Sequence, residues 1–140
     1  MLKRLVVFLA VALLAGACAT TPISSKEAEP VPLGRQLRFQ NPAPGTVPVL
    51  IMRDTGITAS ACATSVYVNG EVAAYVRSGE KVTLNIPAGD VILGVQPDGV
   101  CGLGGGLVEL EAKVQPGRLM HYRIGYDQSG SVGLYRTIER

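Results

Sequence analysis

Residues 63–96 read ATSVYVNGEVAAYVRSGEKVTLNIPAGDVILGVQ, and this stretch decides the fold class. Asn69-Gly70 separates two runs of strand-forming residues, Ala63–Val68 and Glu71–Val76. An Asn-Gly pair in this setting is the strongest short signal of a β-hairpin, because a type I′ turn requires positive φ at both central residues. The stretch therefore predicts two antiparallel strands joined by a tight turn.

A pattern with a period of two residues, typical of β-strands, is present on both sides of the hairpin. Apolar and polar residues alternate, and turns that contain Gly or Pro recur about every 8–12 residues. The further predicted strands are Val47–Arg53, Lys81–Ile86, Asp90–Gln96, Leu107–Val114, Arg118–Tyr126 and Val132–Thr137. No helical period of useful length is present. We predict an all-β domain over residues 46–140, a small antiparallel β-sandwich or barrel of about seven or eight strands.

Length and charge exclude several classes of protein. The chain has 140 residues, 47% of them apolar and 17% charged, which fits one globular domain and excludes disorder over most of the length. It carries 13 basic and 11 acidic residues, but Lys3 and Arg4 lie in a segment that we expect to be removed. The remaining chain is close to neutral. This balance argues against nucleic acid as a partner and against a basic surface for anionic lipid.

Residues 1–17, MLKRLVVFLAVALLAGA, have the organisation of a signal peptide. Two basic residues precede an apolar run of 11 residues, Leu5–Ala15, which is too short to span a bilayer as a helix. The small residues Gly16 and Ala17 then precede Cys18, and this order resembles the lipobox of bacterial lipoproteins. The resemblance implies cleavage before Cys18 and acylation of its thiol. The alternative is an ordinary secretory signal with Cys18 incidental.

Residues 18–45 are rich in proline, which disfavours helices and central strands. We therefore predict a lipid-anchored flexible tether that holds the folded domain away from the bilayer. Within it, Leu37 and Phe39 alternate with polar residues. This short pattern fits either an edge strand or a segment packed on the domain.

Short turn and strand signatures support a family resemblance over residues 47–137. They are the V-x-V-N-G hairpin, the G-E-K-V-T strand start at Gly79, the P-A-G turn at Pro87 and the closing Y-R-I-G-Y at Tyr122. With these features the chain resembles a family of uncharacterised proteobacterial lipoproteins with a small β-sandwich domain. It is more remotely similar to PEGA-type surface domains. The resemblance implies architecture and location, and it carries no catalytic motif.

Three cysteines are present: Cys18, Cys62 and Cys101. If Cys18 is acylated, an even pair remains in an oxidising compartment. We predict a Cys62–Cys101 disulfide, which closes a loop of about 40 residues and contributes about 4 kcal/mol in the chain-entropy model. The glycine-rich loop that contains Cys101 lacks the following helix and lysine of a phosphate loop.

Four charged or titratable residues form the candidate recognition face: Glu109, Glu111, His121 and Arg123. If the strands on either side of Pro116 form a hairpin, Glu109 lies opposite Arg123 and Glu111 opposite His121. The five tyrosines offer an alternative, a ring-stacking surface for sugars. No catalytic residue, metal ligand set or cofactor is predicted, because the single histidine has no identifiable nucleophile or metal partner.

These features lead to a functional prediction. We expect a non-catalytic interaction or structural module of the cell envelope, held by its lipid at the outer membrane and facing the periplasm. Its partners are the membrane and an envelope protein or peptidoglycan. The inner membrane and the cell surface are alternative locations. The alternative function is a peptidoglycan-binding, carbohydrate-binding or lysozyme-inhibitor-type lipoprotein.

Overall fold

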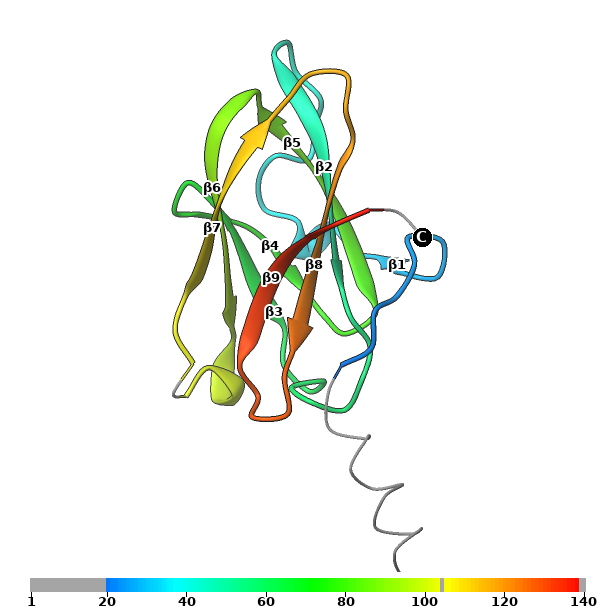
Figure 1. Ribbon diagram of the computed structural model, residues 1–140, viewed down its shortest axis with the longest axis vertical. Coiled ribbons are helices and arrows are strands. Elements are labelled where there is room, and N and C mark those ends of the chain that lie inside the picture. The colour runs from blue at the N-terminus through cyan, green and yellow to red at the C-terminus, as the bar shows by residue number, and fades with distance from the viewer. Residues whose placement is uncertain (1–19, 104, 139–140) are drawn as a thin grey trace, which may run out of the picture.

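The computed structural model describes residues 20–103 and 105–138, which form a β-sandwich of two sheets (Figure 1). The strands are β1 (Glu29–Pro30), β2 (Thr46–Arg53), β3 (Thr64–Val68), β4 (Glu71–Val76), β5 (Glu80–Pro87), β6 (Gly89–Pro97), β7 (Val108–Val114), β8 (Met120–Tyr126) and β9 (Val132–Thr137). Two short 3₁₀ helices, η1 (Leu33–Arg35) and η2 (Gly99–Gly102), lie in the connections. The all-β prediction is confirmed, and each of the eight predicted strands is present.

The Asn69-Gly70 hairpin forms as its sequence predicts. Asn69 has φ 48° and Gly70 has φ 80°, the positive values that a type I′ turn requires. Strands β3 and β4 pair antiparallel on either side, with an irregularity in register between Val66 and Tyr67. Ala73 is the extra residue on β4, since Val66 pairs with Ala74 and Tyr67 with Val72.

The two sheets differ in strand direction. The four-stranded sheet has the order β4-β3-β6-β7 and is antiparallel throughout. The five-stranded sheet has the order β1-β5-β2-β8-β9, and in it β1 pairs parallel with β5 and β2 parallel with β8. The fold is therefore a mixed sandwich rather than a purely antiparallel one, because β8 joins the sheet beside β2 instead of beside β7, the strand before it.

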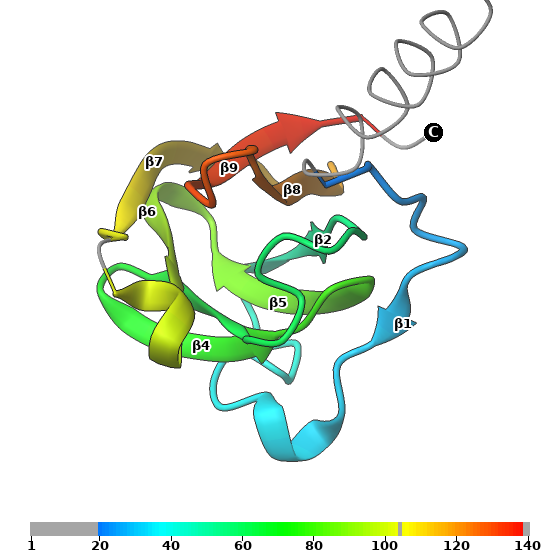
Figure 2. The same ribbon diagram turned by 90° about the horizontal axis from the view of Figure 1, so that it is seen from below.

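The core lies between the two sheets, where the alternating apolar residues of both face each other (Figure 2). Val49 and Ile51 of β2 and Leu84 of β5 are fully buried, as are Val66 of β3 and Leu93 of β6. Burial of such a side chain contributes about 1.5–3 kcal/mol relative to its exposure. Period two in the sequence therefore becomes a continuous apolar layer.

The prediction of a flexible tether is wrong for the described part of that segment, residues 20–45. Instead, this stretch wraps around the sandwich (Figure 2). The Thr21 and Thr55 backbones exchange hydrogen bonds of 2.7 and 3.0 Å, and β1 adds to the edge of β5. Ala28 and Val31 are 3% and 2% exposed. Proline excluded helices and central strands here, but it did not prevent packing at a sheet edge.

Residues 35–40 pack on the domain without forming a strand. The N–H groups of Leu37 and Arg38 both donate to the carbonyl of Ala73, at 2.8 and 3.1 Å. That carbonyl belongs to the bulged residue of β4, so the irregularity provides the acceptor that holds this segment. Phe39 packs against the core with φ 62°.

The predicted disulfide is present between Cys62 and Cys101. Their Cα atoms lie 6.2 Å apart, within the usual range, and the sequence separation is 39. The bridge joins the loop before β3 to η2. Cys18, the predicted acylation site, and the predicted signal peptide at 1–17 lie outside the described residues.

Candidate functional site

The four residues of the predicted recognition face lie on two different sheets. Glu109 and Glu111 are on β7, which pairs with β6, whereas His121 and Arg123 are on β8, between β2 and β9. The predicted pairing of Glu109 with Arg123 and of Glu111 with His121 is therefore wrong. The turn after Val114 carries the chain from one sheet to the other, and these residues do not form one face.

Burial explains why β8 does not pair with β7. The residues of β8 that point away from the core are buried as well: His121 is 7% exposed and Gly125 is buried. On β7 the corresponding residues, Glu109 and Glu111, are exposed. A strand buried on both faces belongs in the middle of a sheet, and β8 takes that place between two neighbours.

Arg123 forms an ion pair with a buried carboxylate. Its Nε lies 3.2 Å from Oδ2 of Asp54, which is 1% exposed, and its guanidinium stacks 5.4 Å from the centre of the Tyr135 ring. Burial raises the pKa of Asp54, although Arg123 acts against that rise. Arg123 is therefore engaged with Asp54 and Tyr135 on the outside of the five-stranded sheet and is not available as an open recognition residue.

The sequence did not single out Arg53, which is a buried cation. It is 1% exposed, and its guanidinium donates to the carbonyls of Cys62 (2.7 Å), Ala59 (2.7 Å) and Val76 (3.1 Å). It also lies 4.8 Å from the centre of the Tyr126 ring. A basic residue at a strand end usually faces solvent, so the only sequence signal was the absence of polar alternation in Val47–Arg53.

Glu109 and Glu111 remain the exposed charged pair of the predicted site. They lie on the outside of the four-stranded sheet, opposite Gly94 and Ile92 of β6. Ile92 is 42% exposed. We call this surface the outer face and define it by Tyr67, Ile92, Gln96, Glu109 and Glu111.

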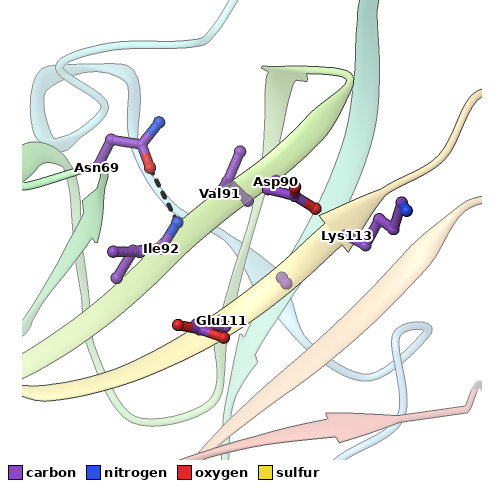
Figure 3. Close-up of a pocket in the computed structure, with 7 residues that line it drawn as sticks. Asn69, Asp90, Val91, Ile92, Glu111 and Lys113 are labelled. Atoms are coloured by element: carbon purple, nitrogen blue, oxygen red, sulfur yellow. Dashed lines mark hydrogen bonds between the residues drawn. The ribbon is translucent and has the colours of Figure 1, made fainter.

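An open cavity lies at one end of the outer face (Figure 3). Its volume is about 560 Å³, and its polar lining comes from Asn69, Asp90, Glu111 and Lys113. Asn69 is held in place, because its Oδ1 accepts the Ile92 N–H at 2.8 Å. The cavity thus combines two carboxylates, an ammonium group and an exposed apolar side chain, a mixture suited to binding a polar ligand through several weak contacts.

The rest of the outer face is partly aromatic. The Tyr67 hydroxyl donates to Oε1 of Gln96 at 3.2 Å. Neighbouring side chains fill the space above Gly94, since an added Cβ would lie only 3.1 Å from Leu107 and 3.3 Å from Tyr67. Of the other tyrosines, Tyr122 and Tyr126 are core residues. The five tyrosines therefore do not form one row.

Within residues 20–103 and 105–138, no cluster of three or more His, Cys, Asp or Glu side chains could hold a metal ion. Over the same described residues, no helix has the length and apolarity needed to cross a membrane. Among the described residues, the arrangement offers an exposed sheet face with an open cavity at one end. No protein-family model, curated protein or solved structure matches this chain.

Proposed function

We propose that this protein is a lipid-anchored, non-catalytic binding module of the cell envelope, acylated at Cys18. The observation that carries the proposal is the combination of a lipobox-like sequence with a disulfide-closed sandwich to which Thr20, two residues after Cys18, is hydrogen-bonded. A structural disulfide is typical of proteins exposed to an oxidising compartment. Ala19, rather than Asp, follows the cysteine. By resemblance to enteric lipoproteins, this residue favours sorting to the outer membrane and its periplasmic side.

The binding surface in this proposal is the outer face. Glu109 and Glu111 are exposed and lack the cationic partners that the sequence suggested, so their charge is available to a ligand. The cavity beside them adds Asp90 and Lys113. An anchored domain gains effective concentration near other envelope components, so a weak site is sufficient.

The test has two parts. Replacement Cys18→Ser should abolish incorporation of a labelled fatty acid and release the protein from membranes, whereas Ser25→Ala should do neither. A photo-crosslinking amino acid at position 111 should then capture a discrete partner in cells. The same amino acid at position 136, where Arg136 is exposed on the other sheet, should not. An acylated protein that crosslinks identically from both positions contradicts the outer face as the binding surface.

One observation favours a second candidate, a peptidoglycan- or carbohydrate-binding module. Tyr67 lies beside Gln96 on the same face as the carboxylates, and an aromatic ring next to amide and carboxylate groups is suited to sugar recognition. Retention on purified peptidoglycan that is lost in Tyr67→Ala and kept in Tyr135→Ala supports this candidate. Equal retention of both variants contradicts it.

A further inference from the structure

Three large apolar side chains are exposed at one end of the sandwich. Ile57 is 75% exposed, Val100 is 77% exposed and Leu103 is 82% exposed. They lie on two loops, residues 55–63 and 99–103, that the Cys62–Cys101 bridge joins. We call these three side chains the apolar tip. The loops that carry it lie at the lower end of the sandwich in Figure 1 and face the viewer in Figure 2.

The loops of the apolar tip carry no charge. Residues 55–63 read TGITASACA and residues 99–103 read GVCGL, with no Asp, Glu, Lys or Arg. Isolated exposed apolar residues need no explanation, but several on adjoining uncharged loops mark a surface that contacts another apolar phase. The neighbouring turn, residues 127–131, is polar. Only the apolar tip is therefore suited to burial in an apolar phase.

The loops are fixed rather than loose. Arg53 donates to the carbonyls of Ala59 and Cys62, both at 2.7 Å, and so pins the first loop to the sandwich. The disulfide then attaches the second loop to the first. Because the sandwich holds both loops in place, their apolar side chains stay exposed instead of folding back onto the domain.

The N-terminal chain reaches the domain at the same end. Thr20 N–H donates to the carbonyl of Tyr126 at 3.2 Å, at the end of β8, and Thr21 pairs with Thr55, the first residue of a tip loop. Cys18 precedes Thr20 by two residues, a separation that spans at most about 7 Å. An acyl chain on Cys18 therefore places this end of the sandwich at the bilayer surface.

We propose that the domain stands end-on on the membrane, with Ile57, Val100 and Leu103 inserted into the lipid interface. This inference rests on the proposed acylation of Cys18 and replaces a domain held away from the bilayer by one whose orientation is fixed. The exposed Arg77 lies on the β4–β5 turn, which adjoins this end because Gly79 N–H donates to the Arg53 carbonyl. A cation there is suited to lipid phosphate. The orientation turns the outer face sideways, where a neighbouring envelope component can reach it.

The absence of tryptophan from the sequence allows a direct test. The acylated full-length protein is reconstituted in vesicles of phosphatidylethanolamine and phosphatidylglycerol that contain lipids brominated on their acyl chains. Single variants Ile57→Trp, Val100→Trp and Leu103→Trp report on the tip. Leu119→Trp is the matched control, because Leu119 is 50% exposed and precedes β8 at the opposite end of the sandwich. Thiol labelling confirms the disulfide, and hence folding, in each variant.

The tip tryptophans should be quenched by brominated lipid and should show roughly twofold less quenching by acrylamide than the control, because interfacial side chains are buried about 5–10 Å into the headgroup boundary. Equal acrylamide quenching at both ends overturns the inference. Shielding from acrylamide without quenching by brominated lipid also overturns it, because a protein or a second copy then covers the tip. Mass spectrometry separates the two proposals: an unacylated Cys18 overturns both, whereas an acylated chain with an unshielded tip overturns only this one.

Discussion

Thr20 and Tyr126 are joined by three hydrogen bonds, although their sequence separation is 106. The Thr20 N–H and the Thr20 hydroxyl both donate to the Tyr126 carbonyl at 3.2 Å, and the Tyr126 N–H donates to Thr20 Oγ1 at 2.8 Å. The hydroxyl also lies 3.5 Å from Oδ2 of Asp54. Thr20 is thus attached to the end of β8, only two residues after the predicted acylation site Cys18.

Replacing Thr20 with Val should weaken this attachment. The valine keeps the shape of the side chain but removes the acceptor for the Tyr126 N–H, which should lower the free energy of unfolding by about 1 kcal/mol. Urea denaturation of the mature protein measures the change. Thr21→Ala is the control, because Thr21 pairs through its backbone and its side chain is exposed. Equal losses in both variants would mean that the hydroxyl contributes nothing.

Ionisation of Asp54 should destabilise the fold as the pH rises. Burial raises its pKa above the ordinary value of 3.8, so between the two values the native state binds more protons than the unfolded state. The free energy of unfolding therefore falls as the pH rises from the unfolded-state pKa to the native-state pKa of Asp54. Above the native-state pKa, the contribution of Asp54 to stability no longer changes with pH. Glu80 acts in the opposite sense, since its pKa is lowered: burial would raise it, but the hydrogen bonds from Arg35 and Arg77 outweigh burial.

The difference between wild type and Asp54→Asn isolates this effect. The stability of the variant relative to wild type should increase as the pH rises from 3.8, the ordinary pKa of the carboxyl, through its raised native pKa, as measured by urea denaturation at several pH values. Asp90→Asn, at an exposed position, is the control and should show no such trend. A relative stability of Asp54→Asn that is constant across this range would be evidence against a raised pKa.

Loss of the Cys62–Cys101 bridge should cost a large share of the stability of the domain. The closed loop, with a sequence separation of 39, corresponds to about 4 kcal/mol in the chain-entropy model. The double variant Cys62→Ser, Cys101→Ser should therefore unfold at a much lower urea concentration than wild type. Wild type in dithiothreitol should match the variant. Free thiols at both positions in protein purified from the envelope would contradict the bridge.

Arg53 should tolerate no substitution well. Arg53→Met fills similar space but leaves the carbonyls of Ala59, Cys62 and Val76 without their donor, which should cost about 3 kcal/mol or more. Arg53→Lys keeps the charge but cannot reproduce the fork of donors, so it should also destabilise. Arg136→Met, at an exposed site, should be nearly neutral. Thermal or urea unfolding tests this order, and an Arg53→Met variant as stable as Arg136→Met would refute it.

The strands of this protein could be predicted because their signals are local. Asn69-Gly70 requires a backbone that only a tight hairpin provides, and period two places Val82, Leu84 and Ile86 on one face whatever their neighbours are. The pairing of Cys62 with Cys101 could be predicted because these are the two cysteines that remain if Cys18 is acylated. None of these inferences depended on knowing which strands are adjacent in space.

Only the tertiary structure decided which strands lie beside each other in the two sheets. Residues Glu109 to Arg123 were expected to form a hairpin, because alternation constrains which face a residue takes but not which strand lies beside it. Burial on both faces of β8 and the competition of β2 for that position are non-local, and they separated Glu109 from Arg123. The proline-rich segment shows the same limit. Its composition excluded regular structure, yet the bulge carbonyl of Ala73 and the free edge of β5, which appear only in the folded sandwich, bind it to the domain.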